Sequence, residues 1–343
     1  MVTEAIEAVA SGHDLTAEQA QEVLSEIMHG EVGEAQTAAF LIALRTKGET
    51  VDELVGLART MRALAEPVAA GDGELLDTAG TGGGRITTFN VSTTSAFVAA
   101  GAGCRVAKHG NRSATSLCGS ADLLEALGAR IDLGPDEVGR CIDEVGFGFM
   151  FAPAHHRATR HVVPVRKQLA VRTIFNFLGP LTNPAGATRQ LIGVSHTEYL
   201  ELVAGALQKL GTRRAAVVSS EDGMDEISMG GETRLLEVTP DGIEPHTITP
   251  ERVGLERGDP EAVRGGTPEE NAEITRSVLG GEQGPRRGLV VLNAGAAMFV
   301  ADRVTSFDDG VRLAEETIDS GAALDLLERF IAKTTELAPV GQT

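Results

Sequence analysis

The first 72 residues carry hydrophobic positions at helical spacing. Thr16 and Gln19 have the spacing of a capping box before "AQEVLSEIMHG", and Gly30 is placed to stop that helix. Thr50 and Glu53 repeat the device before an apolar face that recurs every three or four residues, at Val51, Leu54, Val55, Ala58 and Met61. The pattern predicts a small all-helical domain over residues 1–72.

One segment of this domain, "TAAFLIAL" at residues 37–44, is apolar on all sides. A helix without a polar face is buried, either inside its own domain or against a second subunit. We favour the second interpretation, a homodimer that associates through the helical domain.

From Leu75 onward, short β-type runs alternate with helical ones. The β-type runs are "ELLD", "CRVAK", "ARID", "FGFMF", "RQLIGVS", "RRAAVVSS" and "GLVVLN", separated by helical stretches such as "STTSAFVAAG" and "TEYLELVAGALQKLG". This alternation predicts βαβ units and a parallel sheet. Residues 155–185 interrupt it with a helical stretch that ends at Gly179, Pro180 and Pro184.

The predicted fold class is therefore α/β, a large α/β domain with a mainly parallel central sheet plus a small all-α domain. We expect the large domain to span residues 73–165 and 187–343, and the insert at 166–186 to pack on the helical domain. Residues 250–270 are predicted to form a loop.

Composition narrows the function. The formal net charge of −19 over 343 residues repels nucleic acid and anionic membranes, so an anionic ligand must be held locally. The three cysteines, Cys104, Cys118 and Cys141, lack disulfide or zinc spacing, which suggests reduced thiols. The sequence also lacks a signal-peptide pattern and a long apolar run, so we expect a cytoplasmic protein.

Two glycine- and hydroxyl-rich turns each follow a predicted strand. The first, "DTAGTGGGRITTFNVSTT" at 77–94, suits phosphate because glycines expose backbone N–H groups and the next helix adds its dipole. It matches neither G-x-G-x-x-G nor the P-loop, and alone it could be a tight turn. The second, "KHGNRSATSLCGSAD" at 108–122, adds the donors Lys108, His109 and Arg112 and the hydroxyls of Ser113, Thr115, Ser116 and Ser120. Two such turns on adjacent units favour one anion-binding crevice over two solvated loops.

Two further elements add charge. Asp225 and Glu226 follow the strand-type run "RRAAVV" and suit a hard divalent ion such as Mg²⁺ bridging to phosphates, although paired acids on a loop are often only solvated. Residues 157–172 crowd five cations, at Arg157, Arg160, Arg166, Lys167 and Arg172. Most of these should be solvated, but one guanidinium turned inward could grip a carboxylate with two hydrogen bonds.

Eight blocks in order carry a family resemblance over essentially the whole chain. They are "AGTGG", "FNVST", "KHGNR", "GSAD", "MDE", "RTIFNFLGPLTNP", "GGTPEENA" and "LNAG". In this order they resemble anthranilate phosphoribosyltransferases of tryptophan biosynthesis. The resemblance implies transfer of the 5-phosphoribosyl group from phosphoribosyl pyrophosphate to the amine of anthranilate. It also implies release of pyrophosphate, a homodimer, and Mg²⁺ as cofactor with two ions per subunit.

The resemblance also implies the site residues. The phosphoribosyl pyrophosphate site would comprise Gly80, Thr81, Gly82, Gly83, Thr88, Asn90, Ser92, Thr93, Lys108, Asn111, Ser116 and Ser120. Ser92 would hold one metal ion directly, and Asp225 and Glu226 a second. Arg166 would engage the anthranilate carboxylate, with Gly80 and Asn111 near its ring and amine and His109 and His156 along its entry path.

The chemistry that follows needs no general base, because an aromatic amine is already neutral at pH 7. Negative charge develops on the departing pyrophosphate, so Lys108, the N–H groups of Gly82 and Gly83 and the metal should stabilise its departure. Arg166 would fix the acid end so that the amine faces the ribose carbon.

Two departures from the family pattern stand out. Where the family usually has G-T-G-G-D-G, this chain has Gly84 in place of the acid and Arg85 after it. This difference predicts tighter pyrophosphate binding, slower product release and altered Mg²⁺ dependence. Where the family usually has "HP", this chain has Arg157 in place of the proline. We expect this difference to affect the shape of the acceptor tunnel and its preference for anthranilate over substituted analogues.

Two other functions remain open. A pyrimidine nucleoside phosphorylase-like enzyme would show a "K-x-S-T-G-G" loop, which the sequence lacks. A non-catalytic relative that binds nucleic acid would need a basic groove, which fits poorly with a net charge of −19. The nucleobase-salvage signature of two acids followed by T-G-x-T is also missing.

Overall fold

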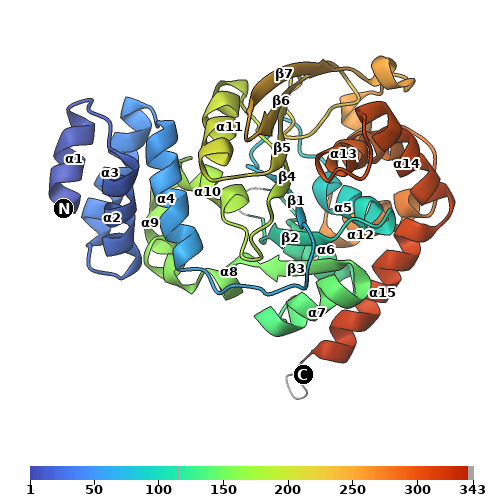
Figure 1. Cartoon of the computed structure of the whole chain (residues 1–343), viewed down its shortest axis with the longest axis horizontal. Coiled ribbons are helices and arrows are strands. Elements are labelled where there is room, and N and C mark those ends of the chain that lie inside the picture. The colour runs from blue at the N-terminus through green and yellow to red at the C-terminus, as the bar shows by residue number, and fades with distance from the viewer. Residues whose placement is uncertain (114–115, 339–343) are drawn as a thin grey trace.

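A seven-stranded sheet organises the computed structural model, which describes residues 1–113 and 116–338 (Figure 1). The strand order is β3-β2-β1-β4-β5-β6-β7. The strands are β1 Leu76–Gly80, β2 Val106–Gly110, β3 Phe147–Phe151, β4 Arg189–Gly193, β5 Arg214–Ser220, β6 Thr233–Thr239 and β7 Gly242–Ile248. Strands β1 to β5 run parallel, and β6 and β7 are antiparallel to their neighbours.

Helices make up the rest of the regular structure. The amino-terminal group comprises α1 Val2–Ala10, α2 Ala17–Met28, α3 Glu34–Lys47 and α4 Val51–Ala63. Helices between the strands are α5 Val91–Gly101, α6 Ser120–Leu127, α7 Pro135–Val145, α8 Ala152–His155, α9 Val163–Leu169, α10 Phe175–Leu181 and α11 Leu200–Lys209. After β7 come α12 Pro268–Leu279, α13 Pro285–Val300, α14 Phe307–Asp319 and α15 Ala322–Leu337. The short 3₁₀ turns are η1 Arg157–His161, η2 Thr197–Tyr199, η3 Pro250–Val253 and η4 Pro260–Val263.

The two predicted capping boxes are present. The Thr16 hydroxyl accepts from the Gln19 N–H and the Gln19 side chain accepts from the Thr16 N–H, and Thr50 and Glu53 do the same. Each box satisfies backbone N–H groups that the first turn leaves without a partner. Both helices begin where the sequence predicts, so the capping residues next to them set where these helices start.

Two apolar cores lie on opposite faces of the sheet. Ala216 and Val218 of β5 point into a core with α5, α13 and α15, whereas Ala215 and Val217 point into a second core. This second core contains the buried faces of α1–α4, α10 and α11, and it includes Val165 and Ile174 of the 155–185 segment. Figure 1 shows the amino-terminal helices beside this segment at one end of the molecule. The helical part is thus continuous with one face of the sheet, and the domain boundaries given above stay a prediction.

Two predicted β-type runs are wrong. Residues 129–132, "ARID", have no strand partner, because the outer edge of β2 is already paired with β3 and the Arg130 N–H donates to the Thr334 hydroxyl at 3.1 Å. "GLVVLN" lies inside α13, where Pro285 occupies the first turn and residues are buried all around the helix. A run of buried apolar residues fits a core strand and a core helix equally well.

The sheet ends in a hairpin that the sequence analysis did not find. Strands β6 and β7 pair from Thr233↔Ile248 to Thr239↔Gly242, with Pro240 and Asp241 in the connection. Pro245 lies within β7, and residues 244–247 of this strand are exposed. No described helix is both long and apolar enough to cross a membrane.

Glu53 ties the capping box to the helical core. Its side chain is fully buried, accepts from the N–H groups of Leu15 at 3.0 Å and Thr50 at 2.8 Å, and pairs with the buried Lys47 ammonium at 3.1 Å. Replacing Glu53 by Ala strands these donors, so we expect Glu53→Ala to lower the free energy of unfolding by about 3 kcal/mol in urea denaturation.

Asp52→Ala is the matched control for this prediction. Asp52 pairs with Lys209 at 2.7 Å, and both side chains are half exposed. Loss of such a surface pair should cost no more than about 1 kcal/mol. Equal losses in the two variants would contradict the role given to Glu53.

Candidate active site

Three loops meet at one edge of the sheet. Strands β2, β1, β4 and β5 are neighbours and parallel, so their carboxyl ends lie at the same edge. Residues 81–90 follow β1, residues 111–119 follow β2, and residues 221–232 follow β5. In parallel sheets this edge is where ligands bind. The two predicted phosphate turns and the acidic loop are thus brought to one place.

The acidic loop lies directly over the ends of β1 and β4. Gly80 and Gly193 are register partners, and a Cβ atom would lie 2.4 Å from Asp225 Oδ2 at Gly80 and 1.6 Å from the Asp225 carbonyl oxygen at Gly193. The Gly82 N–H donates to Asp225 Oδ2 at 2.8 Å. Glycine at positions 80 and 193 therefore lets the acidic loop touch the first turn.

The first turn itself bends through left-handed backbone. Gly82 has φ +68° and Gly83 φ +77°, conformations that favour glycine. At Gly84 a Cβ would lie 2.9 Å from the Gly223 carbonyl oxygen and 3.4 Å from Asp225 Oδ1. An acid at position 84 would thus crowd the acidic loop. The predicted effect of Gly84 and Arg85 on product release and metal dependence stays a prediction.

A buried lysine joins the two turns. Lys108 is 1% exposed, and its ammonium donates to the Thr78 carbonyl at 2.5 Å and to the Ser92 hydroxyl at 3.4 Å. Burial lowers the pKa of Lys108, while the carboxylates of Asp77 and Glu226 act in the opposite direction. The Glu226 carboxylate in turn accepts from the Ser92 N–H at the start of α5. Lys108, Ser92 and Glu226 thus form one polar cluster.

The remaining residues of the first turn are held by neighbours. The Thr81 N–H donates to the Gly193 carbonyl at 2.9 Å, and Thr88 bridges to Arg264. Asn90 Nδ2 donates to the Cys118 carbonyl of the second turn at 3.3 Å. The Thr93 hydroxyl is buried and has no hydrogen-bond partner among the described residues.

The second turn is closed by its own hydroxyls. Ser120 Oγ donates to the Asn111 carbonyl at 3.2 Å, and the hydroxyls of Ser116 and Ser113 lie 2.5 Å apart. Arg112, which the sequence suggested as an anion donor, pairs instead with Asp122 at 2.8 Å and Glu125 at 2.6 Å. Thr115 lies outside the described residues.

The carboxylates of Asp225 and Glu226 are suited to a cation. Burial raises the pKa of Asp225, and burial followed by the charge of Asp225 raises the pKa of Glu226 well above its usual value. Two adjacent acids held at such a cost fit a divalent ion with oxygen ligands. No group of three or more His, Cys, Asp or Glu side chains within 1–113 and 116–338 forms a metal cage. Mg²⁺ commonly completes such a partial set with phosphate and water oxygens.

The predicted acceptor side contains two uncharged histidines. The rings of His109 and His156 lie 5.0 Å apart, and both Nε2 atoms are buried without a partner among the described residues. Burial, helped by the neighbouring histidines, lowers the pKa of His109 to about 3 and that of His156 to about 4. His109 Nδ1 lies 3.2 Å from the Gly179 carbonyl, which fixes the ring.

The arginines of the 155–185 segment divide between inside and outside. The Arg166 guanidinium is partly buried over the Phe175 ring, 5.5 Å from its centre, and burial lowers its pKa. Arg172 also turns inward and donates to the Gly82 carbonyl at 2.7 Å. Arg157 points outward, with its side chain 72% exposed and paired with Glu66 at 2.9 Å, and its predicted effect on the acceptor tunnel stays a prediction.

Several residues of the site were missed from the sequence. Asn183 Nδ2 donates to the buried Asp77 carboxylate and to the Ala107 carbonyl, both at 2.8 Å, and the His109 N–H also donates to Asp77. Asn271 Nδ2 donates to Asn90 Oδ1 at 2.9 Å. Asn183 and Asn271 lie in the motifs "LTNP" and "PEENA". The resemblance includes both motifs, but the sequence alone gave neither asparagine a role.

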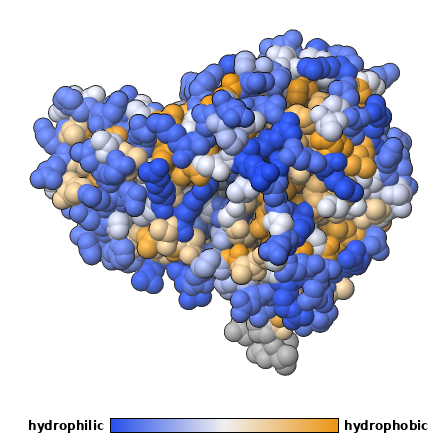
Figure 2. Space-filling model, in the orientation of Figure 1, coloured by the Kyte–Doolittle hydropathy of each residue, from blue (hydrophilic) through white to orange (hydrophobic). Residues whose placement is uncertain are grey.

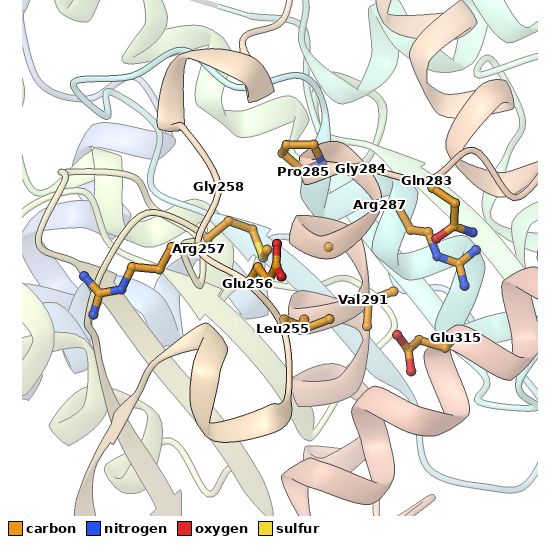
Figure 3. A pocket seen from close by; sticks show the side chains of 12 residues that line it. Leu255, Glu256, Arg257, Gly258, Gln283, Gly284, Pro285, Arg287, Val291 and Glu315 are labelled. Atoms are coloured by element: carbon orange, nitrogen blue, oxygen red, sulfur yellow. The ribbon is translucent and has the colours of Figure 1, made fainter.

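A separate cavity of about 370 Å³ lies between the 255–258 loop and helices α13 and α14 (Figure 3). None of the predicted site residues lines it. Its buried arginine, Arg287, already pairs with Asp319 at 2.8 Å, and Figure 3 shows the Arg257 guanidinium directed away from α13. Glu256 and Glu315 also line the cavity, so the charged side chains around it are of both signs.

The arrangement of fold and site defines a glycosyl transferase with two parts. The a/b domain of the glycosyl transferase family matches residues 72–324, and its helical bundle domain matches residues 3–65. Anthranilate phosphoribosyltransferase from Rubrobacter xylanophilus is 53% identical over 99% of this chain and 100% of its own length. The corresponding protein from Symbiobacterium thermophilum is 55% identical over 94% of both chains.

Solved structures similar to this chain come from the same family of proteins. The crystal structure of anthranilate phosphoribosyltransferase from Thermus thermophilus has a TM-score of 0.92 and 47% identity, covering 96% of this chain and 99% of that one. The Saccharomyces cerevisiae enzyme in complex with PRPP and Mg has a TM-score of 0.90 and 27% identity, covering 98% of both chains. The chain belongs to the anthranilate phosphoribosyltransferase family. The predicted resemblance and fold class are confirmed.

The buried histidines generate a pH prediction. His109 stays neutral in the folded protein down to about pH 3, whereas unfolded histidine takes up a proton near pH 6.5. Stability is therefore lost as the pH falls below about 6.5, and His109 alone should account for about 2 kcal/mol between pH 8 and pH 5. In His109→Asn, the loss of unfolding free energy over this interval should be smaller by that amount in urea titrations.

His13→Asn is the control, because His13 is exposed and its ring stays in water in both states. This variant should reproduce the wild-type pH dependence. If His109→Asn does the same, the histidine is not held neutral by burial.

Proposed function

We propose that this chain transfers the 5-phosphoribosyl group from phosphoribosyl pyrophosphate to the amine of anthranilate, with release of pyrophosphate. The observation that carries the proposal is the contact of the Gly82 N–H with the Asp225 carboxylate, 2.8 Å apart at the strand ends. A backbone N–H beside a carboxylate supports phosphate binding and cation binding at one site. The relatives named above, one of them in complex with PRPP and Mg, support the same reaction.

The phosphoribosyl pyrophosphate site comprises both turns. The residues are Gly80, Thr81, Gly82, Gly83, Thr88, Asn90, Ser92, Thr93, Lys108, Asn111, Ser116 and Ser120. Lys108 brings a buried positive charge beside Ser92 at the start of α5, where the helix dipole also favours an anion. The Gly82 N–H and the Asp225 carboxylate satisfy each other, so substrate and cation would each take one of the two groups.

Ser92, at the start of α5, would hold one Mg²⁺ ion, and Asp225 and Glu226 of the acidic loop would hold a second. When bound, Mg²⁺ supplies positive charge that offsets the charge on the pyrophosphate oxygens. The chain's own contribution is positioned donors. Lys108 and the backbone N–H groups of Gly82 and Gly83 stabilise the negative charge that develops as the pyrophosphate leaves.

The acceptor needs orientation more than activation. The anthranilate amine is neutral and attacks the ribose carbon without a strong base, and we assign no residue to that role. Arg166 holds the carboxylate, Gly80 and Asn111 lie near ring and amine, and His109 and His156 provide an uncharged wall. Uncharged histidines suit an aromatic ring, because a bound ring then displaces no water from a charged side chain. The relatives favour this reaction over a nucleoside phosphorylase and over nucleic-acid binding.

Arg166→Ala tests the acceptor site. Loss of a charge-assisted pair with the carboxylate should raise the KM for anthranilate about 10- to 100-fold. The KM for phosphoribosyl pyrophosphate should change little. Both are measured by the fall of anthranilate fluorescence in the presence of phosphoribosyl pyrophosphate and Mg²⁺.

Lys167→Ala is the matched control, since Lys167 is the next residue of α9 and is exposed. It should behave like the wild type. No turnover by the unmodified chain would overturn the proposed reaction, whereas an unchanged anthranilate KM in Arg166→Ala would remove only the role of Arg166.

We also propose that the chain forms a homodimer through the helical part and resides in the cytoplasm. Helix α3 buries Phe40, Leu41 and Leu44 but leaves Ile42 36% exposed, so the apolar segment at 37–44 is only half covered within one chain. Figure 2 shows apolar residues among the polar ones on the helical part. The three cysteines are free and buried, as expected for a reducing compartment.

Ile42→Asp tests the dimer. A charge at the centre of an apolar contact should weaken association at least tenfold by analytical ultracentrifugation, because the carboxylate would have to be desolvated. Ile42→Val keeps the apolar surface and should remain a dimer. A wild-type chain that sediments as a monomer at micromolar concentration would contradict the proposal.

A further inference from the structure

Gly82 is held through both of its backbone polar groups. Its carbonyl oxygen accepts from Arg172 Nη1 at 2.7 Å and from the Ser195 hydroxyl at 3.0 Å, while its N–H faces Asp225. Gly83 lies equally close, because a Cβ there would be 2.2 Å from Arg172 Nη1. Since the peptide group is planar, the contacts that hold the Gly82 carbonyl also set the direction of the Gly83 N–H, which lies in the same peptide plane.

Arg172 reaches the turn from the acceptor side. It lies in the connection between α9 and α10, and its own carbonyl accepts from Arg45 Nη1 of α3 at 2.8 Å. Helix α9 carries Arg166, whose carbonyl accepts from the Ala170 N–H at 3.1 Å. A short path of bonds therefore runs from the backbone of Arg166 through Ala170 and Arg172 to the Gly82 carbonyl.

The connection between α9 and α10 contains two features that cost free energy. Ala170 has φ +51°, a left-handed conformation that an L-residue with a side chain adopts at a cost. Arg172 Nε and Nη2 are buried and have no hydrogen-bond partner among the described residues. Arginines retained for stability alone normally have their buried donors satisfied, so these unpaired donors call for another explanation.

We propose that Arg172 is a positioning residue that aims the Gly83 N–H at the pyrophosphate and couples the glycine turn to the acceptor helix α9. The inference rests on the proposed function, because it assigns the two sides of the contact to the two substrates. Arg172 touches neither substrate in this proposal. It acts through the Gly82 carbonyl, with Ser195 as its partner.

Three full-length variants test the coupling. Arg172→Met removes the guanidinium but keeps a long side chain, Arg172→Lys keeps one donor for the Gly82 carbonyl, and Arg160→Met is the control from the same segment. Arg160 is exposed, and its Nε donates to His161 Nε2 at 3.1 Å. Amide hydrogen exchange of residues 82–84 is measured without ligands, together with the KM of each substrate, binding of phosphoribosyl pyrophosphate with Mg²⁺ by calorimetry, and the Tm.

In Arg172→Met we expect exchange at 82–84 to rise, and both KM values to rise about tenfold, as for loss of a charge-assisted hydrogen bond. The calorimetric Kd should rise in parallel. The Tm should stay within about 2 °C of wild type, because the change also removes two buried donors that lack partners. Arg172→Lys should recover part of each effect, and Arg160→Met should show none.

Ser195→Ala, alone and combined with Arg172→Met, extends the test. Because both side chains hold one carbonyl, their effects on the KM for phosphoribosyl pyrophosphate should be non-additive. Exchange and KM values in Arg172→Met equal to those of Arg160→Met would overturn the proposal, as would a lowered Tm with both KM values unchanged. If the unmodified chain binds phosphoribosyl pyrophosphate without turnover, the reaction fails, but exchange and calorimetry still decide the role of Arg172.

Discussion

The close approach of the acidic loop to the ends of β1 and β4 is the constraint on which the site depends. Gly80 and Gly193 face each other across two parallel strands, and the Asp225 backbone and side chain fill the space where their Cβ atoms would stand. A side chain at either position would lift the loop away from the sheet edge. Without that contact the carboxylates would not reach the first turn, and Gly82 would lose the partner of its N–H.

The same edge explains why so many charged groups are buried there. Lys108, Asp77 and Glu226 would each be unfavourable alone, because burial disfavours the charged form of every one of them. Together they reduce one another's cost, and Asn183 and the backbone N–H groups of Ser92 and His109 supply hydrogen bonds. Groups held by their own hydrogen bonds act as fixed dipoles, and fixed dipoles stabilise developing charge with little reorganisation.

The sequence could predict the parts whose causes are local. Capping boxes at Thr16 and Thr50 and the glycine turns after β1 and β2 are read from neighbouring residues, and they appear where expected. "GLVVLN" misled because a helix buried on all sides has no polar face to reveal its period. Arg172 could not be separated from the four cations near it, because its inward direction depends on Gly82, which is 90 residues away in the sequence.

The last strand shapes how molecules meet. Proline has no N–H to donate to a neighbouring chain, and Pro245 interrupts the row of backbone donors along β7. Glu244 and His246, exposed on either side of it, put polar side chains at this border. A second molecule would gain little by adding a strand there. The outer edge of β7 therefore disfavours pairing with another molecule and, with it, the formation of fibrils.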